Sequence, residues 1–167
     1  MEYKKYDRLF YPDDESGQIL LNWWNELEND RGGRAELRRA KTLSEIAFIP
    51  SYHRLCNKLQ FHEKDRKRLA LITGLCSHVK ENSPELIASL MASPKTGGDK
   101  AALSGLRFRK LLAINDSEEL YQMMVRIIRL LGNRANICDM ARVLYWWNEK
   151  TKQDLAFKYY EKAFNEK

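Results

Sequence analysis

The sequence predicts an all-α protein, a helical bundle of about eight or nine helices. Apolar residues recur at helical spacing along most of the 167 residues, and capping residues flank several of these segments. Only 8 glycines and 4 prolines are present, and no alternating strand pattern of useful length occurs. These observations argue against a chain built from many strands and tight turns.

In the N-terminal half, a first helix is expected over residues 16–29, where Leu and Trp residues follow helical spacing. Gly32-Gly33 should break that helix, and a short basic helix should lie within residues 31–41. Residues 42–45 form a capping box, with Thr at the first position and Glu at the fourth, and should open another short helix. Pro50 ends that helix and can occupy the first turn of the next.

A longer helix is expected over residues 63–79, and Ser83-Pro84 has the pattern of an N-cap followed by a first-position proline. Residues 93–100, with the sequence SPKTGGDK, have the composition of a flexible linker. The chain is therefore expected to be a single domain, residues 1–167. Within it, residues 1–92 and 101–167 can form sub-lobes joined by this linker.

Beyond the linker, a helix over residues 104–112 is capped by its first serine, and residues 116–119 form a second capping box. The following helix has a Leu/Met/Ile stripe, and Gly132 lies where a C-terminal cap belongs. Apolar stripes over residues 137–147 and 155–163 predict the last two helices.

The composition also indicates a location for the protein. No apolar run approaches the ~20 residues needed to span a bilayer, and the first residues lack the apolar core of a signal peptide. Three cysteines, an odd number, suit a reducing compartment. We therefore expect a cytoplasmic protein without a membrane partner.

The net charge of +6 conceals strong local differences. Residues 1–30 carry a net −5, whereas residues 31–68, 95–110 and 126–142 carry +7, +4 and +3. Basic blocks of this kind are typical of proteins that bind a polyanion such as nucleic acid. The alternative is that these charges only solvate the surface.

Three groups of basic residues are candidates for nucleic-acid contact. In the first, four cations fall within about 80° of arc if residues 31–41 are helical: Arg31, Arg34, Arg38 and Lys41. The second follows the expected start of a helix at residue 104, where backbone amides also favour anions. The third lies on the helices after residue 116. The candidate nucleic-acid-binding residues are Arg34, Arg38, Arg39, Arg107, Arg109, Lys110, Arg126, Arg129, Arg142 and Lys150.

Signals for catalysis or metal binding are weak. The three histidines and three cysteines lack the paired spacing of a structural zinc site, and TGGDK lacks the spacing of a phosphate loop. A helix-turn-helix pattern that begins at Ala70 and Gly74 fails at Lys80, where an apolar residue is needed. We therefore predict a protein that is not an enzyme and that uses no metal or cofactor.

Specific strings, in addition to charge, carry a family resemblance. Residues 34–40 read RAELRRA and residues 49–55 read IPSYHRL. In the C-terminal half, residues 104–112 read SGLRFRKLL and residues 140–147 read MARVLYWW, followed by Lys150. In order and spacing this set resembles the Cascade small subunit, the CasB family of type I-E CRISPR systems.

The resemblance implies an all-α, non-catalytic subunit of a crRNA-guided antiviral surveillance complex. Two copies would assemble head to tail and contact the repeated backbone subunits and the large subunit. Their basic surface would stabilise the R-loop, chiefly by holding the displaced strand of the target DNA near the guide–target duplex. The matching cations are Arg34, Arg38, Arg39, Arg107, Arg109, Lys110, Arg142 and Lys150. Arg126 and Arg129 are added from their exposed position on the expected helix.

Two other functions stay open at this point. In one, the protein is a structural adaptor whose basic patches dock acidic protein surfaces without touching DNA. In the other, it is a cryptic nuclease that cleaves single strands with a metal ion.

Overall fold

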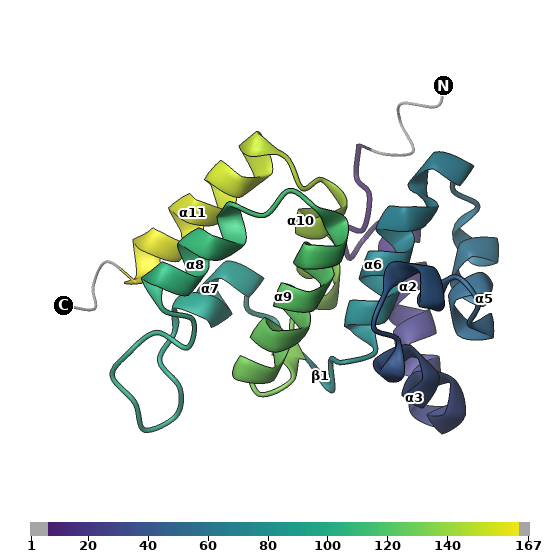
Figure 1. Ribbon diagram of the computed structural model, residues 1–167, viewed down its shortest axis with the longest axis horizontal. Coiled ribbons are helices and arrows are strands. Elements are labelled where there is room, and N and C mark those ends of the chain that lie inside the picture. Colours follow the sequence, from purple (N-terminus) through teal and green to yellow (C-terminus); the bar gives the residue numbers. More distant parts are fainter. Residues whose placement is uncertain (1–6, 164–167) are drawn as a thin grey trace.

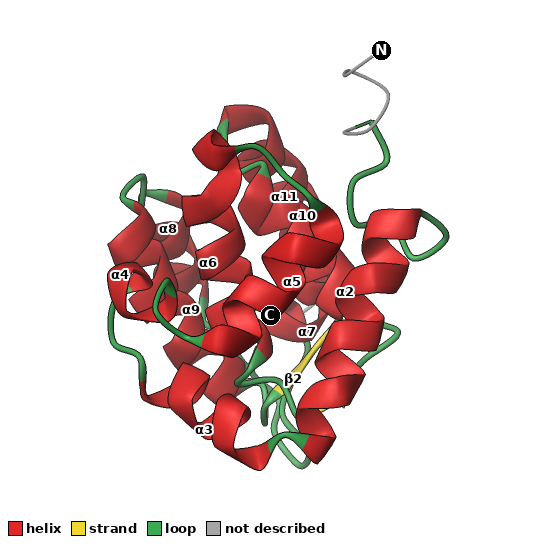
Figure 2. Ribbon diagram, turned by 90° about the vertical axis from the view of Figure 1, so that its right-hand side faces the viewer, coloured by secondary structure: helices red, strands yellow, loops and turns green. Residues whose placement is uncertain are grey.

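The computed structural model describes residues 7–163, which form ten α-helices, two 3-10 turns and one pair of very short strands. This result confirms the prediction of an all-α bundle (Figure 2). The helices are α2 (Glu15–Glu26), α3 (Arg31–Arg39), α4 (Leu43–Ile46), α5 (Pro50–Leu59), α6 (Arg66–Cys76), α7 (Ile87–Ala92), α8 (Gly105–Leu112), α9 (Ser117–Leu130), α10 (Ile137–Tyr145) and α11 (Glu149–Ala163). The 3-10 turns are η1 (Leu27–Asn29) and η2 (Glu63–Asp65), and the strands are β1 (Glu81–Asn82) and β2 (Arg134–Ala135).

Helix α6 lies at the centre of the fold. The chain is buried without interruption from Leu69 to Val79, as expected of a helix that is covered on all sides. It packs against α4, α5, α9 and α10. A Cβ atom at Gly74 would lie 2.5 Å from Ile46 Cδ1 and 2.8 Å from Tyr121 Cε2. Glycine at this position therefore lets α4 and α9 approach α6 closely.

The two ends of the molecule are formed by different helices. Helices α2, α3 and α5 lie at one end and α7, α8 and α11 at the other, with α9 and α10 between them (Figure 1). One cluster of buried apolar side chains runs from Leu9 to Tyr159. The expected linker, residues 93–100, forms a loop between α7 and α8 that is exposed from residue 94 onward. The division into sub-lobes stays a prediction. None of the described helices is both long enough and apolar enough to cross a membrane.

The predicted helix caps form as the sequence indicates. Thr42, Ser104 and Asp116 each accept a hydrogen bond from the backbone N–H three residues later, at distances of 3.0–3.3 Å. At the end of α9, Gly132 adopts a φ of +73°, and the N–H of Asn133 donates to the carbonyl of Ile128. This is the hydrogen bond of a Schellman cap, which favours glycine at the left-handed position.

Two local predictions were wrong. Gly32-Gly33 lie in the first turn of α3, because the Asp30 carboxylate caps this helix by accepting from the N–H of Gly33 at 3.0 Å. Ser83 does not begin a helix, since its N–H donates to the carbonyl of Ala135 and continues the pairing of β1 with β2. Helix α7 begins at Ile87 instead, where the carboxylate of Asp139 accepts from the N–H of Ile87 at 2.8 Å.

Candidate nucleic-acid interface

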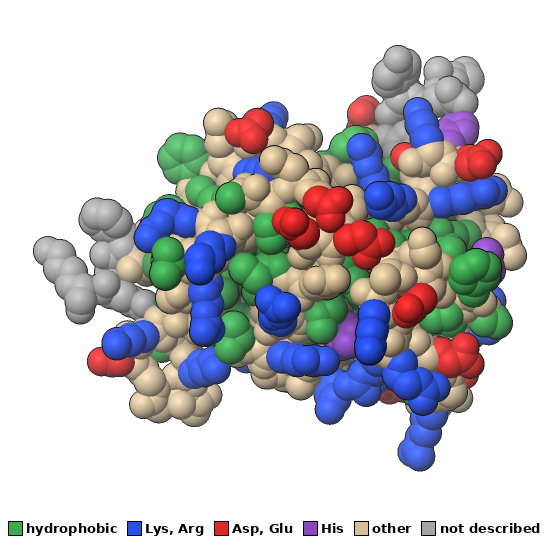
Figure 3. Space-filling view, in the orientation of Figure 1, with side chains coloured by type: hydrophobic (Ala, Val, Ile, Leu, Met, Phe, Trp, Pro, Cys, Tyr) green, Lys and Arg blue, Asp and Glu red, His purple; other side chains and the backbone are tan. Residues whose placement is uncertain are grey.

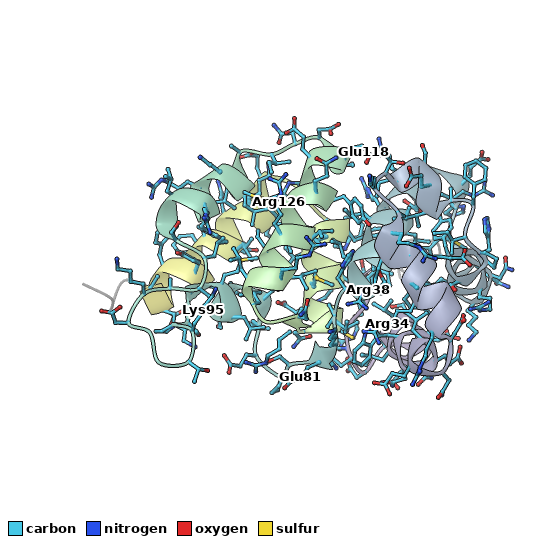
Figure 4. The ribbon with its side chains drawn as sticks, turned by 60° about the horizontal axis from the view of Figure 1, so that its bottom comes forward. Arg34, Arg38, Glu81, Lys95, Glu118 and Arg126 are labelled. Atoms are coloured by element: carbon cyan, nitrogen blue, oxygen red, sulfur yellow. The ribbon has the colours of Figure 1, made fainter. Side chains whose placement is uncertain are left out.

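A groove of about 500 Å³ lies between the C-terminal end of α3 and the outer face of α9. Five of its lining residues are cations, and none of the described residues that line it is acidic. The groove therefore offers an anion concentrated positive charge from two sides. Figure 4 shows Arg38 and Arg126 on these two helices. The lining residues are Arg38, Arg39, Ala40, Lys41, His78, Tyr121, Gln122, Val125, Arg126 and Arg129.

Hydrogen bonds between distant parts of the chain fix the width of this groove. The hydroxyl of Tyr121, on α9, donates to the carbonyl of Ala40 at 3.0 Å. One turn earlier on α9, the carboxylate of Glu118 accepts from the N–H of Leu43 at 3.1 Å. Because both bonds join α9 to the segment that follows α3, the two basic walls are held at a fixed separation.

Arg34 positions α3 and does not line the groove. Its guanidinium donates to the carbonyl of Val79 at 2.6 Å and to that of Ser77 at 3.2 Å. The side chain is half-buried, and burial lowers the pKa of its guanidinium. Both carbonyls follow the last residue of α6, and that of Val79 also accepts from Nε1 of Trp24 at 3.1 Å. We therefore assign Arg34 to holding α3 against α6.

The second predicted cluster lies on α8, outside the groove. Arg107, Arg109 and Lys110 are all exposed there. Helix α8 lies at the end of the molecule that is far from α3 (Figure 1). On the face drawn in Figure 3, Lys and Arg side chains gather across the lower half, whereas Asp and Glu cluster above its centre. The candidate cations of α3 and α8 therefore lie toward opposite ends of the molecule.

The remaining two candidates differ in accessibility. Lys150 is exposed in the first turn of α11. Arg142 is half-buried on α10, where it pairs with Asp139 at 3.3 Å and donates to the carbonyl of Phe10 at 3.2 Å. Its guanidinium also lies 4.5 Å from the centre of the Tyr11 ring. Arg142 therefore fastens residues 10 and 11 to α10.

His78 is a buried residue that forms part of the groove. It is only 5% exposed, and burial lowers the pKa of its imidazole to about 4, with Arg38, Arg129 and Arg34 adding to this effect. The ring is therefore neutral at physiological pH. A neutral ring can lie beneath the arginines without adding to their mutual repulsion.

This lowered pKa predicts a loss of stability in mild acid. Between pH 6.5 and pH 4 the unfolded chain binds a proton at His78 that the folded chain does not, so the free energy of unfolding falls as the pH falls. For His78 alone we expect a loss of about 2 kcal/mol between pH 7.5 and pH 5. Urea unfolding at the two pH values measures it, and His78→Gln should remove this part of the loss. His62→Gln, a change at an exposed histidine, is the control, and an unchanged pH dependence in His78→Gln would contradict the assignment.

Sequence reasoning missed the apolar part of the groove. Tyr121 and Val125 are an aromatic and an apolar residue of α9, a type expected in the core. His78 is about 40 positions from Arg38 along the chain. The available signal was the polar face of α9, with Gln122, Arg126 and Arg129 spaced at three to four residues. The described residues contain no group of three His, Cys, Asp or Glu side chains that could hold a metal ion.

The fold and this surface define the class: a helical protein whose basic groove and basic helix faces suit an anionic polymer. Residues 33–160 match the family described as CRISPR-associated protein Cse2, and the chain belongs to this family. It is 25% identical over 150 residues to the CRISPR system Cascade subunit CasB of Escherichia coli K12. The aligned region covers 86% of this chain and 91% of that protein. The sequence-based resemblance is thereby confirmed.

The fold is also similar to a chain in the crystal structure of E. coli Cascade bound to a PAM-containing dsDNA target. The TM-score is 0.68 at 18% sequence identity, over 89% of this chain and 96% of that chain. The two chains therefore share the same fold.

Proposed function

We propose that this chain is a non-catalytic, sequence-independent nucleic-acid-binding subunit of a crRNA-guided surveillance complex. In this role it stabilises the R-loop by holding the displaced strand of the target DNA. In crRNA-guided systems base pairing with the guide reads the sequence, so a protein subunit needs only to hold backbone phosphates. The proposal includes no catalytic step.

The observation that carries this proposal is the groove between α3 and α9. Arg38, Arg39 and Lys41 face it from one side, and Arg126 and Arg129 from the other. Guanidinium groups bind phosphate through paired hydrogen bonds, and spaced cations follow a backbone without regard to base identity. The exposed cations of α8 provide a second surface along which the same strand can continue.

Membership of the family supports the partners that the proposal requires. These are a second copy of the chain arranged head to tail, the backbone and large subunits of the complex, the crRNA and the target DNA. Large exposed apolar side chains are available for the protein contacts, since Phe48 is 84% exposed and Phe157 is 78% exposed.

The same exposed side chains favour a second candidate, a structural adaptor without direct DNA contact. One double variant separates the two functions. In assembled complexes, Arg38→Ala with Arg109→Ala should weaken R-loop formation on unrelated targets alike, because both contacts are to phosphates. Two lost contacts to a single strand correspond to a roughly 25-fold loss of strand affinity near 0.1 M salt.

The measurement is R-loop formation by electrophoretic shift, with subunit stoichiometry checked by native mass spectrometry. If the double variant leaves the subunit out of the complex, the adaptor function is correct. If the variant assembles and its defect is confined to one target sequence, sequence-independent strand holding is wrong.

A further inference from the structure

The groove between α3 and α9 has apolar and aromatic lining residues that a site for phosphate alone does not need. Its cations are exposed on α3, α9 and the residue range just after α3. Ala40, Tyr121, Val125 and His78 also line it but are buried or half-buried, so we call these four residues its floor. A phosphodiester backbone, which is charged and strongly hydrated, gains nothing from an apolar and aromatic floor. A ligand that also has a flat, poorly hydrated part would gain from burying it there.

The volume of the groove agrees with a ligand of that kind. At about 500 Å³ the groove falls in the range of sites that hold small organic ligands, roughly 300–1,000 Å³. A surface that only tracks a backbone needs no such volume, because its cations can act without enclosing the strand. The groove is therefore large enough for the base of a nucleotide as well as for its phosphate.

His78 provides a second, independent observation at this groove. Its side chain is 95% buried, and its Nε2 atom has no hydrogen-bond partner among the described residues. Buried polar atoms in folded proteins are nearly always paired, so an unpaired one in the lining of a groove is a place where a bound ligand can supply a hydrogen bond. The edge of a nucleobase carries both donors and acceptors and can serve either tautomer of a neutral imidazole.

We infer that the groove is a nucleotide site, in which one unpaired base lies against Tyr121, Val125 and His78 while its flanking phosphates contact the arginines of α3 and α9. This inference rests on the proposed function and adds that the strand is held by a base as well as by charge. Bases in a duplex are stacked and paired, so the site selects a single strand. Both the displaced DNA strand and a single-stranded RNA carry the required chemistry.

The test compares strands of equal charge with and without bases. Binding of the full chain to oligothymidylate and to an abasic phosphodiester of the same length is measured by fluorescence anisotropy at one salt concentration. Counterion release is the same for both strands, so the difference between their affinities comes from the bases alone. We expect the abasic strand to bind roughly tenfold more weakly. Oligouridylate, as a further arm, distinguishes RNA from DNA as the source of the nucleotide.

Val125→Phe places extra volume on the floor without changing charge. It should abolish the preference for strands with bases and leave binding to duplex DNA unchanged. Asn57→Phe, at an exposed position of α5 outside the groove, is the matched control and should keep the preference. Circular dichroism melting shows whether Val125→Phe is folded. The comparison of oligothymidylate with the abasic strand uses the unaltered chain and does not depend on this variant.

The outcomes separate the inference from the proposed function. If the unaltered chain binds no single strand, strand holding itself is wrong. If it binds both strands equally well and with the same salt dependence, the groove is a phosphate trough and the nucleotide site is wrong. Equal loss of single-strand and duplex binding in Val125→Phe would also overturn the site.

Discussion

Replacing Arg38, Arg126 and Arg129 together with Gln should weaken binding of the full chain to single-stranded DNA roughly a hundredfold near 0.1 M salt. These residues contribute cations from both walls of the groove. Each phosphate contact with a single strand contributes about 0.7 to the slope of log affinity against log salt. We therefore expect the slope to become shallower by about 2, which anisotropy titrations at several salt concentrations measure.

Three exposed lysines outside the groove form a control with the same change of charge. Lys64, Lys67 and Lys158 changed together to Gln lower the net charge equally but leave the groove intact. This control should lose only a small fraction of the affinity, because it retains all the cations that line the groove. Equal losses in the two triple variants would mean that only the net charge matters and that the groove is not the contact surface.

Asp139→Ala should lower the free energy of unfolding by about 3 kcal/mol. Asp139 is 4% exposed, and its carboxylate accepts from the first N–H of α7 at 2.8 Å while pairing with Arg142 at 3.3 Å. Alanine leaves the N–H of Ile87 without its partner and leaves a half-buried guanidinium without its counter-charge. Urea unfolding followed by tryptophan fluorescence provides the measurement.

Two further variants make this prediction specific. Asp139→Asn keeps an oxygen that can accept from Ile87 but loses the charge opposite Arg142, so its effect should be about half as large. Asp154→Ala, at an exposed position of α11, should change stability by less than about 0.5 kcal/mol. A loss below about 1 kcal/mol in Asp139→Ala would show that the carboxylate does not stabilise α7.

The Asp139 network also changes how the predicted site should be interpreted. Arg142 was predicted to bind nucleic acid from the family resemblance, yet its guanidinium contacts Asp139, Phe10 and Tyr11. Arg34 is similarly engaged by carbonyls near the end of α6. If substitution of Arg34 or Arg142 weakens DNA binding, the loss of stability must be measured before the effect is attributed to a lost phosphate contact.

Helix positions and most caps were predictable because their signals are local. The capping residues Thr42, Ser104 and Asp116 bond to backbone groups three residues away, so the sequence within one turn is sufficient. The start of α7 was not predictable. It depends on Asp139, which is 52 residues from Ile87, and on pairing of β1 with β2, and neither leaves a signal near residue 83.

By itself, the sequence determined the all-α class, the family and the blocks of positive charge, because periodicity, motif order and charge are properties of short segments. Only the tertiary structure decided which cations lie together. It joined Arg38 and Arg39 to Arg126 and Arg129 across a groove, and it placed the helix that carries Arg107, Arg109 and Lys110 at the far end of the molecule. The physical reason is that the groove depends on how closely α3, α6 and α9 pack. Gly74 lets α9 approach α6, and the hydrogen bond from Tyr121 to Ala40 holds α9 to the end of α3. Both contacts connect residues that are far apart in the chain.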